Sequence, residues 1–186
     1  MLLIKQMMTL KMGATKMPEI NIFSENIFEG RDLDEKFFID KARKILEFYL
    51  QTPEIYENSC LDRDDYDTVS FDFLYCDSKK THEINREYRE KDYPADIITF
   101  AIFADAQEEE RFIFDGEINL GEVLIALDKV DEEAEKKGTT KEYELMFLIS
   151  HGIMHLLGFD HQTEEDYNFV VDMQNKALEA VGYDKI

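Results

Sequence analysis

Three of the four histidines in this 186-residue chain fall within eleven consecutive positions. His151 and His155 are four residues apart, which places both rings on one face of a helix, one turn above the other. His161 follows Gly158, and glycine is the residue that most often lies just past a helix end in a left-handed conformation. Three neutral imidazoles that converge from a helix and its following turn make a metal site with one open position. The spacing therefore predicts that His151, His155 and His161 bind one metal ion.

The segment that carries the first two histidines is apolar on almost every side, so we expect it to form a buried helix. A single histidine more often serves as a core or surface residue than as a ligand. Two unpaired imidazoles in a core are costly, and one shared metal ion removes that cost for both rings. The apolar surroundings therefore favour the metal site over a purely structural role.

The same histidine spacing occurs in one class of zinc proteases, in which a glutamate directly after the first histidine is the general base. Gly152 occupies that position here, so the general base of a peptidase is missing. A glycine inside a helix costs about 1 kcal/mol relative to alanine. The close approach of a strand or a substrate would account for Gly152, and a small residue that is merely tolerated is the alternative.

Residues 151–161, HGIMHLLGFDH, closely resemble the signature of the YbeY-type bacterial endoribonucleases. Members of that family cut single-stranded RNA during ribosomal RNA maturation. The usual pattern is H-G-x-L-H-L-x-G-Y-D-H, so Met154 replaces a leucine and Phe159 replaces a tyrosine. Both replacements keep an apolar or aromatic side chain and leave the three histidines unchanged.

Two further segments resemble motifs of the same family. Residues 85–100, NREYREKDYPADIITF, are similar to L-N-x-x-Y-R-x-x-D-x-P-T-D-V-L-S-F, with Ala95 and Thr99 in place of the usual threonine and serine. Residues 120–123, LGEV, are a weaker match to L-G-D-I, in which Glu122 keeps the charge of the aspartate on a longer side chain. The resemblance extends over about residues 18–182, and only the histidine motif is highly specific.

The second motif implies that Arg89 is the functional arginine of the family, with Arg86 as the alternative. A phosphodiester transition state carries spread negative charge, and a guanidinium is a fixed, bidentate cation that matches it.

The resemblance implies one catalytic Zn²⁺, although Ni²⁺ and Co²⁺ stay open because ligand softness does not separate them at an all-histidine site. Asp160 either orients a histidine ring or caps the turn. For the general base, a metal hydroxide, substrate groups and Glu122 all stay open.

The resemblance thus implies a zinc-dependent endoribonuclease that acts on single-stranded ribosomal RNA in ribosome maturation, with the ribosome or ribosomal proteins as partners. Two other functions stay open. One is a metal-dependent hydrolase of another substrate, such as a peptidase. The other is a ribosome-assembly factor with a structural metal, whose acidic surface binds basic ribosomal proteins. The net charge of −21 argues against high RNA affinity of the isolated protein, because phosphate contacts normally require a basic surface.

The composition indicates one globular domain in a reducing compartment. Cys60 and Cys76 form no C-x-x-C pair and provide no disulfide framework, which favours a cytoplasmic location. No apolar run reaches the length of a membrane span. We expect residues 1–16 to be a flexible N-terminal extension and residues 17–186 to be a single metal-dependent endoribonuclease domain.

Strands in the middle of the chain with helices around them predict an α+β fold, in which a small mixed β-sheet packs against helices around a central, buried, metal-bearing helix. Thr139 and Glu142 are expected to form a capping box at the start of that helix. Gly121 is expected to mark a bulge inside a strand. The expected strands are 20–22, 69–76, 97–103 and 117–126, the expected helices are 34–50, 79–90, 127–137, 141–157 and 163–181, and the expected loops are 51–67 and 104–116.

Overall fold

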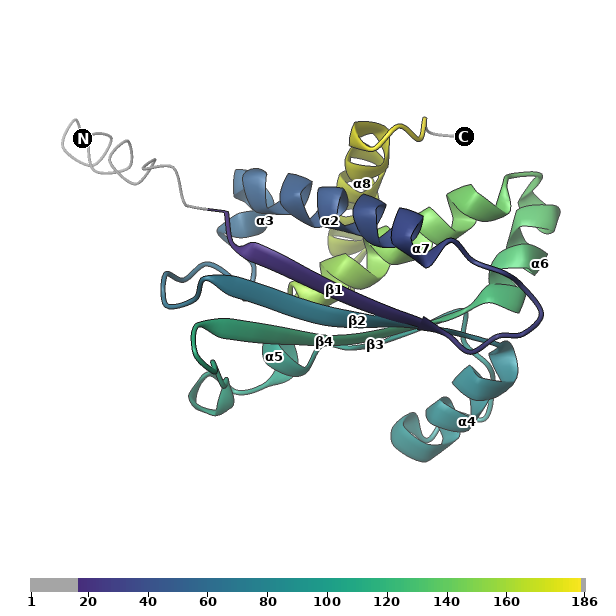
Figure 1. The fold of residues 1–186 in the computed structure, drawn as a ribbon, viewed down its shortest axis with the longest axis horizontal. Helices are drawn as coiled ribbons and strands as arrows, with labels where there is room; N and C mark the ends of the chain where they lie inside the picture. Colours follow the sequence, from purple (N-terminus) through teal and green to yellow (C-terminus); the bar gives the residue numbers. More distant parts are fainter. Residues whose placement is uncertain (1–16, 185–186) are drawn as a thin grey trace.

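Four β-strands form one mixed sheet in the order β1-β2-β4-β3 (Figure 1). The structure is a computed structural model that describes residues 17–184, so the predicted flexible extension at residues 1–16 lies outside the described residues. β1 pairs with β2, and β2 with β4, in parallel, whereas β3 pairs antiparallel with β4. The predicted α+β fold with a small mixed sheet is confirmed. The strands are β1 (Glu19–Asn26), β2 (Thr68–Cys76), β3 (Ile97–Phe100) and β4 (Glu117–Ala126).

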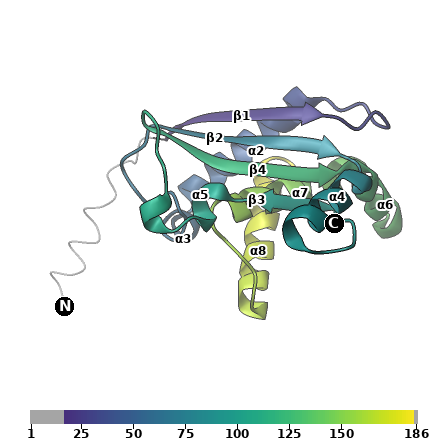
Figure 2. The same ribbon diagram turned by 90° about the horizontal axis from the view of Figure 1, so that it is seen from below.

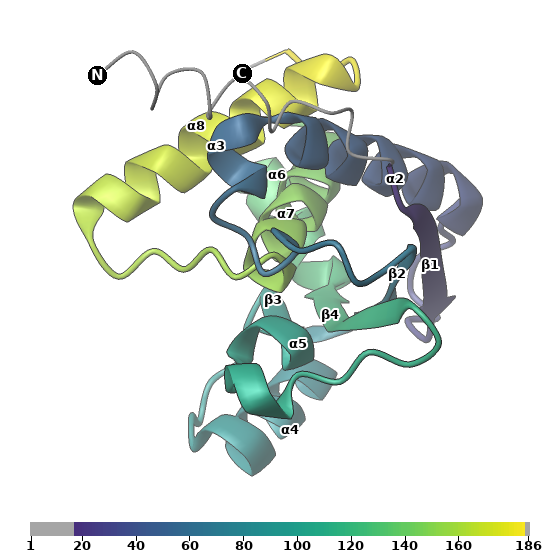
Figure 3. The ribbon, with the colours of Figure 1, turned by 90° about the vertical axis from the view of Figure 1, so that its left-hand side faces the viewer.

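The helices lie on both sides of the sheet, and those that form the core lie on one side (Figure 3). In β2, alternate apolar side chains point to this side, and Val69 and Phe71 are completely buried there. Helices α2 and α7 pack against it, and α8 lies beyond α7 (Figure 1). The helices are α2 (Glu35–Gln51), α3 (Pro53–Tyr56), α4 (Ser78–Arg89), α5 (Ile102–Asp105), α6 (Leu127–Lys137), α7 (Lys141–Leu156) and α8 (Glu164–Ala180), with a 3-10 turn at Glu108–Glu110.

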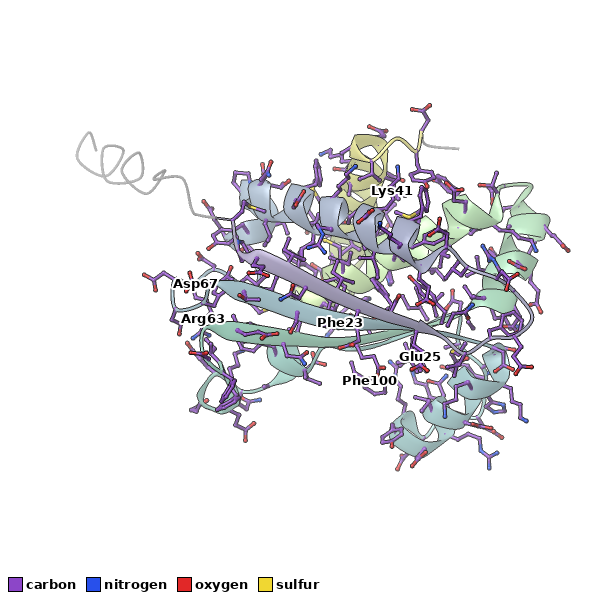
Figure 4. The ribbon with its side chains drawn as sticks, viewed as in Figure 1. Phe23, Glu25, Lys41, Arg63, Asp67 and Phe100 are labelled. Carbon is purple, nitrogen blue, oxygen red and sulfur yellow. The ribbon has the colours of Figure 1, made fainter. Side chains whose placement is uncertain are left out.

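The other side of the sheet is less covered. Seen from below, α4 and α5 lie near the β3 edge (Figure 2), and Phe23 on β1 is 58% exposed. Figure 4 shows Phe23, Glu25 and Phe100 on the side that faces away from α2, whose Lys41 lies on the outer side of the helix layer. The sheet therefore has one face that forms the core and one face that is partly open to solvent.

Helix α7 is the central buried helix that the sequence predicts. Leu145, Met146 and Ile153 on it are completely buried. The capping prediction was wrong by one residue, because the side chain of Thr140 accepts the N-terminal hydrogen bond, from the backbone N–H of Tyr143. The hydroxyl of Thr139 instead donates to the buried carboxylate of Glu144 at 2.6 Å.

Two short helices occupy segments that were predicted as strand or loop. Pro53 begins α3 inside the predicted loop 51–67, since its fixed φ suits the first turn of a helix. The predicted strand 97–103 ends at Phe100 and continues as α5. The reason is Gly121 on the neighbouring strand: a Cβ there would lie 1.9 Å from the carbonyl oxygen of Phe100. The β2–β4 register shifts at this point, so the predicted bulge at Gly121 is confirmed.

None of the helices in residues 17–184 is long and apolar enough to cross a membrane. The two cysteines are free, with Cys76 buried and Cys60 partly buried. The capping box that opens α8 is present, because Thr163 and Asp166 each accept a hydrogen bond from the backbone N–H of the other. This box fixes the start of the helix that packs beside α7.

Candidate metal centre

The three histidines meet at one point. His151 and His155 lie one turn apart on α7, and their Nε2 atoms are 3.0 Å apart. The ring of His161 lies 5.3 Å from that of His151 and 5.2 Å from that of His155, measured between centroids. One ligand atom from each of the three residues lies within 4.8 Å of the other two. The convergence predicted from the spacing is therefore present.

The turn after α7 delivers His161. The N–H of Gly158 donates to the carbonyl of His155, and the N–H of Phe159 donates to the carbonyl of Met154, at 2.9 and 3.0 Å. Gly158 has a φ of 97°, which reverses the chain and favours glycine. Asp160 accepts hydrogen bonds from the backbone N–H of His161 and from Gln162. Of the two roles predicted for Asp160, the structure shows that of capping the turn.

The electrostatics of the three rings suit metal binding. Burial lowers the pKa of His151, and it lowers the pKa of His155 to about 4. Both rings are therefore neutral at neutral pH and each has a nitrogen lone pair to share. Two Zn–N bonds of about 2.0–2.1 Å with tetrahedral geometry bring the nitrogens to about 3.4 Å apart, close to the spacing observed here. The three imidazoles are thus a donor set that fits a borderline divalent cation.

Arg89 is the last residue of α4 and is exposed. Its positive charge contributes to lowering the pKa of His155, so the guanidinium acts on the histidine cluster. Arg86 differs, because its Nε lies 3.6 Å from a carboxylate oxygen of Asp92. The buried amide of Asn85 donates to the carbonyl of Tyr93 at 2.8 Å and holds the segment after α4 in place. Arg89 is thus the candidate whose charge affects an imidazole of the cluster, and its catalytic role stays a prediction.

The carboxylates near the sheet divide between its two faces. Val123 points toward α7, where its Cγ1 lies 2.7 Å from the position of a Cβ on Gly152. Glu122, the preceding residue on β4, therefore points to the opposite face. Burial, and then the nearby charge of Asp72, raise the pKa of Glu122. Its carboxylate does not face the histidines, whereas the exposed Asp96 acts on His151 and partly offsets the lowering of its pKa.

The packing of Gly152 explains the missing glutamate. A Cβ at this position would also lie 3.1 Å from Cγ2 of Val123 and 3.3 Å from Cδ1 of Ile97. The glycine thus allows α7 to approach β3 and β4 closely, which is the first of the two explanations considered for it. A glutamate side chain has no room at this point in the structure.

Two residues on α8 were not recognised as part of the site. Gln174 lies among apolar residues on the buried face of α8, and its Oε1 lies 3.3 Å from Nδ1 of His151. Tyr167 is 53% exposed, and its ring lies 5.9 Å from that of His161. The available signal was a single amide among apolar positions, since a buried polar side chain requires a partner.

These features define a single-domain α+β protein with a three-histidine candidate metal centre on a buried helix. The family model for Endoribonuclease YbeY matches residues 24–182, and the chain belongs to this family. Curated relatives with that name from Bacillus cereus and Bacillus thuringiensis are 36% identical over 148 residues, which cover 78% of this chain and 94% of each relative. The solution structure of TM1509 from Thermotoga maritima has the same fold, with a TM-score of 0.54 and 22% identity over 87% of this chain and 88% of that one.

Proposed function

We propose that this protein is a zinc-dependent endoribonuclease that cuts single-stranded RNA in ribosomal RNA processing. The observation that carries the proposal is the convergence of three ligand nitrogens within 4.8 Å of one another, with an arginine that acts on the same cluster. Membership of the Endoribonuclease YbeY family supports the reaction class. The alternative cations at an all-imidazole site are Ni²⁺ and Co²⁺.

His151, His155 and His161 would hold the ion through their ring nitrogens. Zinc held there would supply Lewis-acid chemistry, either by polarising a phosphoryl oxygen or by lowering the pKa of a water toward about 7. Arg89 donates from its guanidinium to the non-bridging phosphate oxygens and offsets the charge that develops in the transition state. Its exposed position allows a substrate phosphate to reach it.

Of the proton acceptors considered for the site, Glu122 points to the far face of the sheet, so a metal hydroxide and a group of the substrate remain. Asp96 is exposed and its charge acts on His151, but one of its carboxylate oxygens accepts a hydrogen bond from the backbone N–H of Ile97. A general base has to lie within hydrogen-bond reach of the proton that it removes.

The charge of the chain limits how RNA is bound. With a net charge of −21, the protein lacks the excess of basic residues that gives high affinity for a phosphate backbone. We therefore propose that the substrate is ribosomal RNA presented by a ribosomal particle, in which basic ribosomal proteins attract the acidic surface. The proposed location is the cytoplasm, and the proposed catalytic domain is residues 17–186.

The experiment measures cleavage of ribosomal RNA and of a single-stranded oligoribonucleotide by the purified protein, together with its metal content. We expect cleavage that a chelator stops and that Zn²⁺ restores, and we expect His155→Ala to lose both metal and cleavage. His155→Ala that cuts at the wild-type rate contradicts the proposal. If the untreated protein cuts no RNA and the chelator unfolds it, the metal is structural instead. Digestion of casein supports a peptidase.

A further inference from the structure

Gln174 on α8 is completely buried and lies between two groups on α7. Its Oε1 is 3.3 Å from Nδ1 of His151. Its Nε2 donates to the backbone carbonyl of Phe147 at 3.3 Å. Phe147 precedes His151 by one helical turn, so the amide bridges two successive turns of the metal-bearing helix. Within residues 17–184 no other side chain is hydrogen-bonded to an Nδ1 atom of the three histidines.

The two contacts together determine which way the amide points. A carbonyl oxygen only accepts hydrogen bonds, so the NH₂ group of Gln174 has to face Phe147. The amide oxygen then faces His151, and because this oxygen also only accepts, the proton of the neutral ring has to be on Nδ1. The lone pair of His151 is therefore on Nε2, the atom that lies 3.0 Å from Nε2 of His155.

We propose that Gln174 is a positioning residue that fixes the tautomer and the rotation of the His151 ring, so that Nε2 is presented to the metal. This inference rests on the proposed metal site. Ligating histidines generally donate their second ring N–H to an acceptor, and removal of that acceptor weakens metal binding by about 10–100-fold. A neutral amide suits this buried position, because it holds the ring without adding a charge and also donates to the Phe147 carbonyl.

A purely structural role is the alternative, in which Gln174 only joins two helices. The chain offers a matched control for that role. The hydroxyls of Tyr49 on α2 and Ser150 on α7 form a buried hydrogen bond of 2.6 Å, next in sequence to His151. Ser150→Ala removes a buried contact between α7 and a neighbouring helix without removing any contact of an imidazole. It is expected to lower stability and to leave zinc affinity unchanged.

The direct test is the tautomer of His151 in the metal-free protein, read from long-range ¹H–¹⁵N couplings of the imidazole ring. Wild type and Ser150→Ala are expected to hold the Nδ1–H form. Gln174→Met, which keeps the volume and removes the amide, is expected to show a mixture of the two tautomers. A wild-type His151 with its proton on Nε2, or a Gln174→Met ring that is unchanged, overturns the inference.

The second measurement is the zinc dissociation constant by competition with a chelator. Gln174→Met is expected to bind zinc about 10–100-fold more weakly, whereas Gln174→Glu, which keeps an acceptor for the Nδ1 proton, is expected to lose less. Equal losses in the two variants, or an equal loss in Ser150→Ala, contradict a positioning role. Failure of the wild type to bind any divalent cation contradicts the proposed function, and the tautomer measurement still decides the role of Gln174.

Discussion

The Nε2 atoms of His151 and His155 face each other at 3.0 Å from adjacent turns of one helix. Burial keeps both rings neutral at neutral pH, so the pair presents nitrogen atoms to each other inside a mostly apolar helix. Without a metal, one neutral ring can donate its N–H to the lone pair of the other, and a shared cation would replace this hydrogen bond by a bond to a nitrogen of each ring. The stability of the fold and the metal site are thus linked through these two residues.

Zinc is therefore expected to stabilise the folded protein. A ligand that binds only the native state raises the free energy of unfolding by about 2.7 kcal/mol when its free concentration is 100 times its dissociation constant. Thermal unfolding followed by calorimetry at increasing zinc concentration measures this rise. His155→Ala serves as the control and is expected to show a midpoint that zinc leaves unchanged. An equal rise in both proteins would mean that the ion binds elsewhere.

Arg89→Ala is expected to lower kcat on single-stranded RNA by about 10²–10³-fold, the usual cost of removing one donor to a transition-state oxyanion. Zinc content and thermal stability are expected to stay at the wild-type level, because Arg89 is an exposed residue at a helix end. Arg86→Ala is the matched control, since Arg86 lies one turn earlier and interacts with Asp92. Equal losses in the two variants would argue that both act only through the general charge of α4.

The sequence predicted the histidine cluster because its geometry is local. A spacing of four residues fixes His151 and His155 relative to each other, and the turn at Gly158 adds His161 within a few residues. Gln174 was not predicted as part of the site, since its contact with His151 depends on how α8 packs on α7. The end of β3 was missed for a similar reason, because it is set by a contact between Phe100 and the distant Gly121.

The pKa of Glu122 predicts a pH dependence of stability. Burial, and then Asp72, raise this pKa, so the folded state holds the Glu122 proton more tightly than the unfolded state does. The stabilising contribution is complete below about pH 4, the range of an unfolded glutamate, and it is lost as the pH rises through the raised value. Glu122→Gln is therefore expected to be more stable than wild type at pH 7, with the difference vanishing in acid.

A glutamate with the opposite shift provides the control for this experiment. A hydrogen bond from Lys136 lowers the pKa of the exposed Glu133, so its contribution is present above the unfolded pKa and lost in acid. Glu133→Gln is expected to be slightly less stable than wild type at pH 7. Urea unfolding at several pH values measures how each substitution changes the free energy of unfolding. A change in the same direction at pH 7 in both variants would contradict the opposite pKa shifts of Glu122 and Glu133.

Gly152→Ala is expected to be destabilising, although alanine is the better helix former by about 1 kcal/mol. The new methyl group meets Cγ1 of Val123 at 2.7 Å, and overpacking of this kind costs about 1–3 kcal/mol. In a Val123→Ala background, Gly152→Ala is expected to stabilise the protein, because the new methyl group then has room and only the higher helix propensity of alanine affects the free energy of unfolding. A double-mutant cycle by urea unfolding measures the coupling. Independent effects of the two substitutions would show that α7 and β4 do not limit each other here.

Gly121→Ala is expected to be the more damaging of two glycine substitutions. Gly121 has a φ of 127°, and its new Cβ would lie 1.9 Å from the Phe100 carbonyl oxygen, so backbone strain and overpacking together cost roughly 2–6 kcal/mol. Gly138 ends α6 with a φ of 70°, and within residues 17–184 no atom outside its own chain neighbours lies within 4 Å of its Cβ position. Gly138→Ala therefore carries only the left-handed backbone cost of about 1–2 kcal/mol. Urea unfolding of the two variants compares these costs directly, and a Gly121→Ala protein as stable as Gly138→Ala would show that β3 can move away from the bulge.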